Sequence, residues 1–158
     1  MHNIFSVIND LQENSDCHYI DVLPRRILGD DFFTLEEYLL ETCLHDFANS
    51  ISDIVIKLIH YYPAQIYLTE LDADIEFEYA TRIGKDLRFI PLLELSEIIT
   101  YVILHDISSI QVVLGNEPYT IISINGHFSV DIYNASNECL ELLKMLTQQE
   151  GLFLKAAK

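Results

Sequence analysis

Apolar residues in the first 60 positions recur mostly at helical spacing. The segment from Ile4 to Leu11 fits a short amphipathic helix. A second apolar series runs from Leu35 to Ile59 and Pro63 ends it, which predicts a helix of roughly 25 residues. Between the two, Tyr19 to Leu23 is typical of a short strand. Pro24 would end it, because a proline has no amide to continue the hydrogen-bonded ladder.

The beginning of the long helix carries an N-terminal signature. In the segment Thr34–Glu37, the threonine and the glutamate three residues later match a capping box, in which each side chain accepts a hydrogen bond from a free backbone amide. Phe33 and Tyr38 stand where a hydrophobic staple would place them. We therefore expect the helix to begin near Thr34 and to bend near Asn49–Ser50.

After Pro63 the pattern changes to a period of two. Polar and apolar residues alternate from Gln65 to Tyr79, which predicts a half-buried strand. A turn at Gly84–Lys85 and a short strand from Leu87 to Ile90 are expected next. The segment from Pro91 to His105 fits a helix opened by a proline, whereas its β-branched run also suits a strand, and the sequence leaves both open.

The C-terminal third has clearer signals, and its first part predicts three strands. Ile110 to Leu114 forms one of them. The other two, Tyr119–Ile124 and His127–Tyr133, flank Asn125–Gly126, a pair typical of a type I′ hairpin turn.

The last 25 residues predict a helix, and with it the fold class. Ser136 is expected to cap a helix that continues to Gln149, and Gly151 suits the left-handed position after it. Strands and helices do not alternate as in βαβ units, so the chain predicts an α+β fold. We expect a single domain over residues 1–158, with a mostly antiparallel sheet, a long N-terminal helix and a C-terminal helix.

The chain is strongly acidic. Its 25 aspartates and glutamates outnumber its 9 lysines and arginines, so the formal net charge is −16. Twelve of the acidic residues and a single lysine, Lys57, lie between Asp30 and Ala80, and this third of the chain carries a net charge of −11. Nucleic acids and anionic membranes repel such a charge, so we expect neither as a partner and expect a basic protein instead.

The cysteines and the N-terminal residues indicate the compartment. Cys17, Cys43 and Cys139 are far apart, and three cysteines cannot all pair within one chain. The first residues lack the basic and apolar regions of a signal peptide. The longest apolar stretch, near Ile98–Leu104, is far shorter than the ~20 residues of a membrane span. We expect a cytoplasmic protein with unpaired cysteines in its core.

The most distinctive motif is a row of acidic residues in the alternating segment. Glu70, Asp72, Asp74, Glu76 and Glu78 occupy every second position, so a strand would place all five carboxylates on one face. Neighbouring carboxylates would lie about 6.5–7 Å apart, close to the spacing of phosphates along one nucleic-acid strand. The row is therefore a candidate phosphate mimic for a basic groove. The competing interpretation is the charged solvent face of an edge strand.

Other candidate sites are weaker. Asp72–Glu76 has the spacing that begins a calcium-binding loop, but Phe77 and Ile83 stand where the loop needs glycine and glutamate. A histidine, a serine and an aspartate within 127–131 have the residue types of a catalytic triad, yet successive positions on one strand face do not converge. We therefore expect no metal site, no cofactor and no catalytic residues, and a protein that is not an enzyme.

The C-terminal region resembles a known group of proteins. Three stretches carry the resemblance: GHFSVDIYNAS at Gly126–Ser136, LELLK at Leu140–Lys144 and QEGLFL at Gln149–Leu154. They are similar to the hairpin, helix and closing tail of small immunity proteins of bacterial toxin systems, including contact-dependent growth inhibition. The resemblance falls on core and turn positions. It implies a cytoplasmic, non-enzymatic protein that neutralises one cognate toxin, commonly a nuclease.

Charge and resemblance together favour an inhibitor of a basic toxin domain, an RNase or a DNase. We expect its partner-binding residues to be the five carboxylates of the row, together with Glu36, Glu37 and Glu41 of the long helix. Two other classes stay open: an acidic adaptor or scaffold that binds a basic partner without inhibiting it, and a small hydrolase whose site only folding assembles.

Overall fold

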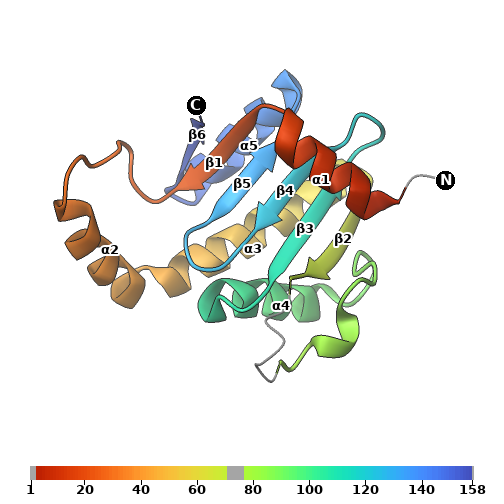
Figure 1. Ribbon diagram of the computed structural model, residues 1–158, viewed down its shortest axis with the longest axis horizontal. Coiled ribbons are helices and arrows are strands. Elements are labelled where there is room, and N and C mark those ends of the chain that lie inside the picture. Colours follow the sequence, from red (N-terminus) through yellow and green to blue (C-terminus); the bar gives the residue numbers. More distant parts are fainter. Residues whose placement is uncertain (1–2, 71–76, 158) are drawn as a thin grey trace.

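The computed structural model describes residues 3–70 and 77–157, which form an antiparallel sheet with helices on both faces (Figure 1). The helices are α1 (Ile4–Asn14), α2 (Asp31–Thr42), α3 (Leu44–Tyr61), α4 (Leu92–His105) and α5 (Asn137–Gln149), with a 3₁₀ turn at Ala80–Arg82. The strands are β1 (Cys17–Asp21), β2 (Ala64–Thr69), β3 (Ser109–Leu114), β4 (Thr120–Ile124), β5 (Val130–Tyr133) and β6 (Phe153–Ala156). The expected α+β class is confirmed.

The strands lie in the order β2-β3-β4-β5-β1-β6, and all neighbouring pairs are antiparallel. The N-terminal strand β1 lies between β5 and the C-terminal strand β6, so both ends of the chain contribute to one side of the sheet. β2 forms the opposite edge. Isolated bridges from Ile83 to Leu68 and from Asp86 to Tyr67 place the following loop along that edge.

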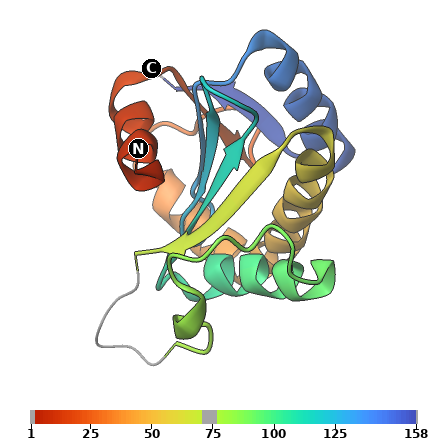
Figure 2. The ribbon, with the colours of Figure 1, turned by 90° about the vertical axis from the view of Figure 1, so that its right-hand side faces the viewer.

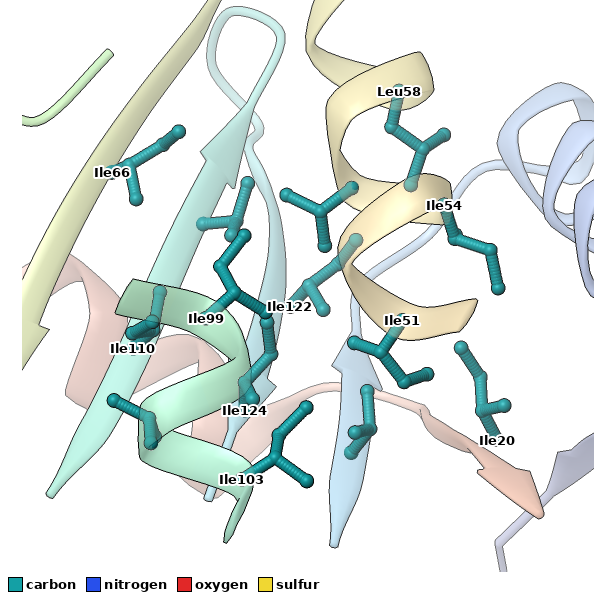
Figure 3. Close-up of a cluster of buried hydrophobic side chains, with 14 of the residues drawn as sticks. Ile20, Ile51, Ile54, Leu58, Ile66, Ile99, Ile103, Ile110, Ile122 and Ile124 are labelled. Carbon is teal, nitrogen blue, oxygen red and sulfur yellow. The ribbon is translucent and has the colours of Figure 1, made fainter. Parts of the chain in front are cut away.

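Helices α3, α4 and α5 pack on one face of the sheet, and α1 packs on the other (Figure 2). The larger core lies beneath the three helices (Figure 3), and its members include Ile51, Ile54, Leu58, Ile99, Ile103, Ile66, Ile110 and Ile122. Each of these side chains is at most 2% exposed. Burial of one such side chain contributes about 1.5–3 kcal/mol, so this layer dominates the stability of the fold.

Helix α1 is attached by a smaller cluster and by polar contacts. Ile8 is 3% exposed and packs with Val113 and Ile121 of the sheet. The Gln12 side-chain amide donates hydrogen bonds to Gln111 Oε1 (3.1 Å) and to Ser123 Oγ (2.7 Å). Gln12 thereby joins the hydrogen bond that Ser123 Oγ already donates to Gln111 Oε1, and links α1 to β3 and β4.

The expected long helix is two helices. α2 begins at Asp31, so Thr34 lies within it and does not cap it, and Phe33 and Tyr38 are too exposed to form a staple. The break falls at Cys43, whose backbone leaves the helical region, and α3 continues as one helix through Asn49–Ser50. Two helices form because α3 buries nine residues against the sheet, whereas α2 buries none.

The hairpin between β4 and β5 is confirmed, but its turn is not type I′. Positive φ occurs at His127, not at Asn125 or Gly126, and the Asn125 amide bonds across a wider loop to the Ser129 carbonyl. Glycine is required at position 126 because Asp106 lies so close that a Cβ there would clash with its side chain and backbone.

The remaining expectations are mostly confirmed. Pro91 to His105 is helical as α4, because its β-branched residues pack into the core. Ser136 caps α5 by accepting a hydrogen bond from the Cys139 amide, and Gly151 is left-handed. The expected strand from Leu87 to Ile90 is wrong: the Leu87 amide donates a hydrogen bond to Ile66 of β2, and the Ile90 amide then bonds back to the Leu87 carbonyl in a turn.

Two further expectations concern the cysteines and the membrane. The three cysteines are unpaired; Cys139 is buried, whereas Cys17 and Cys43 are only half-buried. Within residues 3–70 and 77–157, no helix combines the length and the apolar character needed to cross a bilayer.

Candidate functional site

The acidic row does not have the expected strand conformation at its described ends. β2 stops one residue before Glu70, which has a left-handed backbone with φ 57°. Glu78 is exposed in a turn that precedes the 3₁₀ turn. The expectation of a strand is therefore wrong for Glu70 and Glu78, while Asp72, Asp74 and Glu76 lie outside the described residues.

An aromatic cluster accounts for this departure. Phe77 is 6% exposed and its ring centroid lies 5.5 Å from that of Tyr101 on α4, while Tyr79 lies 5.4 Å from Tyr101. Phe77 and Tyr79 therefore alternate with acidic residues because they pack on a helix, not because they line a sheet. At the other end, the Glu70 carboxylate accepts a hydrogen bond from Oγ of Ser109 (3.3 Å), the first residue of β3.

The second group of expected contact residues lies on α2, which projects from one side of the molecule (Figure 1). This helix has no buried residue. Phe33 is 68% exposed and Tyr38 is 61% exposed, and Leu28, just before the helix, is 81% exposed. Large exposed apolar side chains gathered on one element are typical of an interaction surface.

The two sides of α2 differ. Successive residues of a helix are turned by about 100°, so Phe33, Glu37, Glu41, Thr34 and Tyr38 share one half of its surface. All five are exposed. We call this half the outer face of α2. It combines two aromatic rings with two carboxylates, and Asp30 and Asp31 extend its acidic character at the N-terminus.

The inner half of α2 contains the remaining apolar residues. Phe32, Leu35, Leu39 and Leu40 are half-buried there, and Glu36 lies among them. The structure therefore separates the three expected glutamates: Glu36 belongs to the inner half, whereas the other two belong to the outer face.

The charges of the outer face are not compensated within the protein. No ion pair within residues 3–70 and 77–157 includes a carboxylate of α2. The helix macrodipole favours Asp31 at the N-terminus but disfavours Glu41 in the last turn. Glu37 and Glu41 also repel each other at a spacing of four residues. This arrangement of carboxylates does not stabilise the helix.

The two acidic regions do not form one surface. Tyr19 of β1 and Phe33 of α2 line the same groove, which places α2 at the β1 side of the sheet. Glu70 follows β2, the edge strand at the opposite side. The width of the sheet therefore separates Glu70 from the outer face of α2.

Strands β1 and β5 contain groups with raised pKa values but no activated nucleophile. Burial raises the pKa of Asp131, and burial followed by the Asp131 charge raises the pKa of the Cys17 thiol. Burial, and then the Asp131 charge, also raises the pKa of Tyr133 to about 12. The thiol and the phenol are therefore protonated at neutral pH, which is the opposite of what nucleophilic catalysis requires.

The triad-like residues contact different groups. His127 Nδ1 lies 3.9 Å from Asp106 Oδ2, and Ser129 Oγ accepts a hydrogen bond from Asn125 Nδ2 (3.4 Å). Asp131 bonds to neither His127 nor Ser129 in the described structure. Among the described residues, no group of three or more His, Cys, Asp or Glu is arranged to hold a metal ion.

The interpretation of the sequence did not identify Leu28, Phe33 and Tyr38 as exposed candidates for contact with a partner. The signal was present: Phe33 and Tyr38 fall outside the apolar stripe that Phe32, Leu35 and Leu39 form at helical spacing. Because Phe33 and Tyr38 were assigned to a hydrophobic staple, their position on the acidic side of the helix was not recognised.

Comparisons with known proteins do not assign a relative. A scan against models of protein families, a search of curated proteins and a search of solved structures each find no significant match to this chain.

Proposed function

We propose that this protein is an immunity-type inhibitor that binds and neutralises a basic bacterial toxin domain, an RNase or a DNase, through the outer face of α2. One observation carries the proposal: α2 exposes Phe33 and Tyr38 between uncompensated carboxylates on a helix that buries no residue. Aromatic anchors surrounded by charged groups are the usual composition of a specific protein interface.

The charge supports a basic partner. With a net charge of −16, the protein attracts a cationic domain over long range, which accelerates association, and it repels nucleic acid. A basic nuclease has a cationic groove for its substrate, and a carboxylate-bearing helix can occupy such a groove. The inhibitor then competes with the phosphate backbone for the same lysines and arginines.

The resemblance to immunity proteins concerns the scaffold of the fold and carries no information about the contact surface. Its stretches fall on β5, α5 and β6, where Val130, Ile132 and Leu143 are buried. These elements hold β1, which pairs with both β5 and β6, and the chain leaves β1 towards α2. The proposed binding helix is therefore attached to the part of the fold that carries the resemblance.

The test is a pull-down of the tagged protein from its native cell with two charge-reversal variants. Glu37→Lys/Glu41→Lys changes the outer face of α2. Glu138→Lys/Glu141→Lys on α5 makes the same change in charge at another exposed site. We expect the wild type and the α5 variant to recover one basic protein and the α2 variant to bind it at least tenfold more weakly. Equal recovery by all three forms would refute binding through α2.

The recovered protein is then assayed for cleavage of RNA and DNA with and without saturating wild-type protein. Loss of cleavage in the complex supports inhibition. A partner that keeps its full activity in the complex would replace the inhibitor with the adaptor function. Recovery of no basic protein would refute the proposal as a whole.

The acidic row is tested in the same experiment. A variant with Glu70, Asp72, Asp74, Glu76 and Glu78 changed to their amides removes five charges, and Glu70, at the start of the row, lies across the sheet from α2. We expect it to recover the partner with nearly wild-type affinity and a lower association rate, since distant charges act through long-range steering.

A further inference from the structure

A groove of about 440 Å³ lies beside the outer face of α2. β1, the connection that follows it and the start of α2 form its walls. The residues on which its chemistry depends are Tyr19, Asp21, Arg26, Leu28, Phe32 and Phe33. The groove therefore begins where the proposed binding helix meets the sheet.

Three aromatic rings line the groove. Tyr19 enters from β1, and Phe32 and Phe33 enter from α2 with their ring centroids 6.0 Å apart in an edge-on arrangement. Leu28, which is 81% exposed, also lines the groove. An additional ring would find edge-to-face partners here, a geometry that aromatic pairs prefer.

The charges around the groove favour a neutral side chain inside it. The Asp21 carboxylate is already paired with the Lys155 ammonium at 2.9 Å, and that ammonium lies 5.9 Å from the centroid of the Tyr19 ring. A cationic guest would meet Arg26, and an anionic guest would meet the carboxylates of α2. Asp21 is therefore not free to bind a second cation.

Arg26 adds a preference for an aromatic guest over an aliphatic one. Its side chain forms no ion pair and no hydrogen bond with the described residues. A guanidinium group that is not engaged elsewhere stacks on an aromatic face, where both charge and shape are complementary.

We propose that this groove binds one aromatic side chain of the partner, with lysines or arginines next to it in the partner's sequence. The ring fills the space between Tyr19, Phe32 and Phe33, and the flanking cations reach Asp30, Asp31 and Glu37. This inference rests on the proposed function, and it names the anchor by which the basic partner is held.

The test uses three synthetic pentapeptides and needs no native partner. The first has a central tryptophan between two lysines on each side, the second has alanine in place of tryptophan, and the third keeps the tryptophan but replaces each lysine with glutamate. Each peptide is titrated into the ¹⁵N-labelled full chain. We expect amide shifts at Tyr19, Leu28 and Phe33, and affinity for the first peptide at least tenfold higher than for the other two.

Two variants separate the aromatic site from general charge attraction. Arg26→Ala is expected to weaken binding of the first peptide several-fold. General charge attraction predicts the opposite, because removing a positive charge should strengthen the binding of any cation. Lys144→Ala, on an exposed position of α5, makes the same change in charge elsewhere and is expected to leave binding unchanged or slightly stronger.

Equal affinity for the tryptophan and alanine peptides, shifts confined to other surfaces, or no binding would each overturn the inference. Failure of the toxin assay would not alter this titration, so the anchor site and the inhibitory function can fail separately.

Discussion

Replacing Phe33 with serine should separate binding from folding. Phe33 is 68% exposed, so about one third of its surface is buried. Complete burial of a phenylalanine is worth about 1.5–3 kcal/mol, which limits the loss of unfolding free energy to about 1 kcal/mol. A side chain that anchors an interface costs at least about 2 kcal/mol when it is truncated, or about 30-fold in Kd. We therefore expect a larger effect on binding than on stability.

Two measurements on the same protein preparation test this expectation. Urea denaturation followed by circular dichroism gives the free energy of unfolding, and biolayer interferometry against the recovered partner gives Kd. Phe89→Ser is the control for exposure, because Phe89 is 90% exposed at a site away from α2 and should change neither quantity appreciably. Phe47→Ala is the control for burial, because Phe47 is 2% exposed and should lose about 3–5 kcal/mol.

The reasoning would be refuted in either of two ways. If Phe33→Ser lowers the unfolding free energy as much as Phe47→Ala, α2 is part of the core and its exposure does not indicate an interface. If Phe33→Ser folds normally and binds the partner with unchanged Kd, the outer face of α2 is not the contact surface.

Three further predictions concern stability. Gly126→Ala should lower the unfolding free energy by about 1–3 kcal/mol in urea denaturation, because the new methyl group meets Asp106; an unchanged midpoint would contradict this. Burial raises the pKa of Asp131 above its unfolded value, so the stability that this group adds at low pH is lost as pH rises through the folded pKa. The stability of Asp131→Asn relative to the wild type should thus increase as pH rises above about 4, the unfolded pKa of an aspartate, and a pH-independent difference would exclude this explanation. Ser136→Ala removes the acceptor for the Cys139 amide and should cost about 1 kcal/mol by thermal denaturation, whereas an unchanged Tm would argue against the cap.

Most elements could be predicted from the sequence because their signals are local. The helical spacing of apolar residues predicted α1 and α5, while the sequence left α4 open between helix and strand, and the apolar runs of the C-terminal third predicted β3, β4 and β5. Ser136 and Gly151 act through neighbours a few residues away, so their roles as caps do not depend on the rest of the fold.

The errors occurred where distant contacts override local pattern. The alternation around Phe77 and Tyr79 fits a strand, but their rings pack on Tyr101, more than 20 positions later in the chain. Asn125–Gly126 is a typical pair for a tight turn, yet the close approach of Asp106 to Gly126 decides the geometry of the loop.

The sequence by itself determined the acidic charge, the α+β class and the presence of most helices and strands, because these follow from composition and from spacing within a few residues. Only the tertiary structure decided that the chain from Asp31 to Tyr61 forms two helices, of which one packs on the sheet and the other does not. The apolar residues of α3 have a complementary sheet surface, whereas Phe33 and Tyr38 have none within the described protein. Which apolar side chains remain exposed depends on where other elements end in space, and helical spacing contains no information about that.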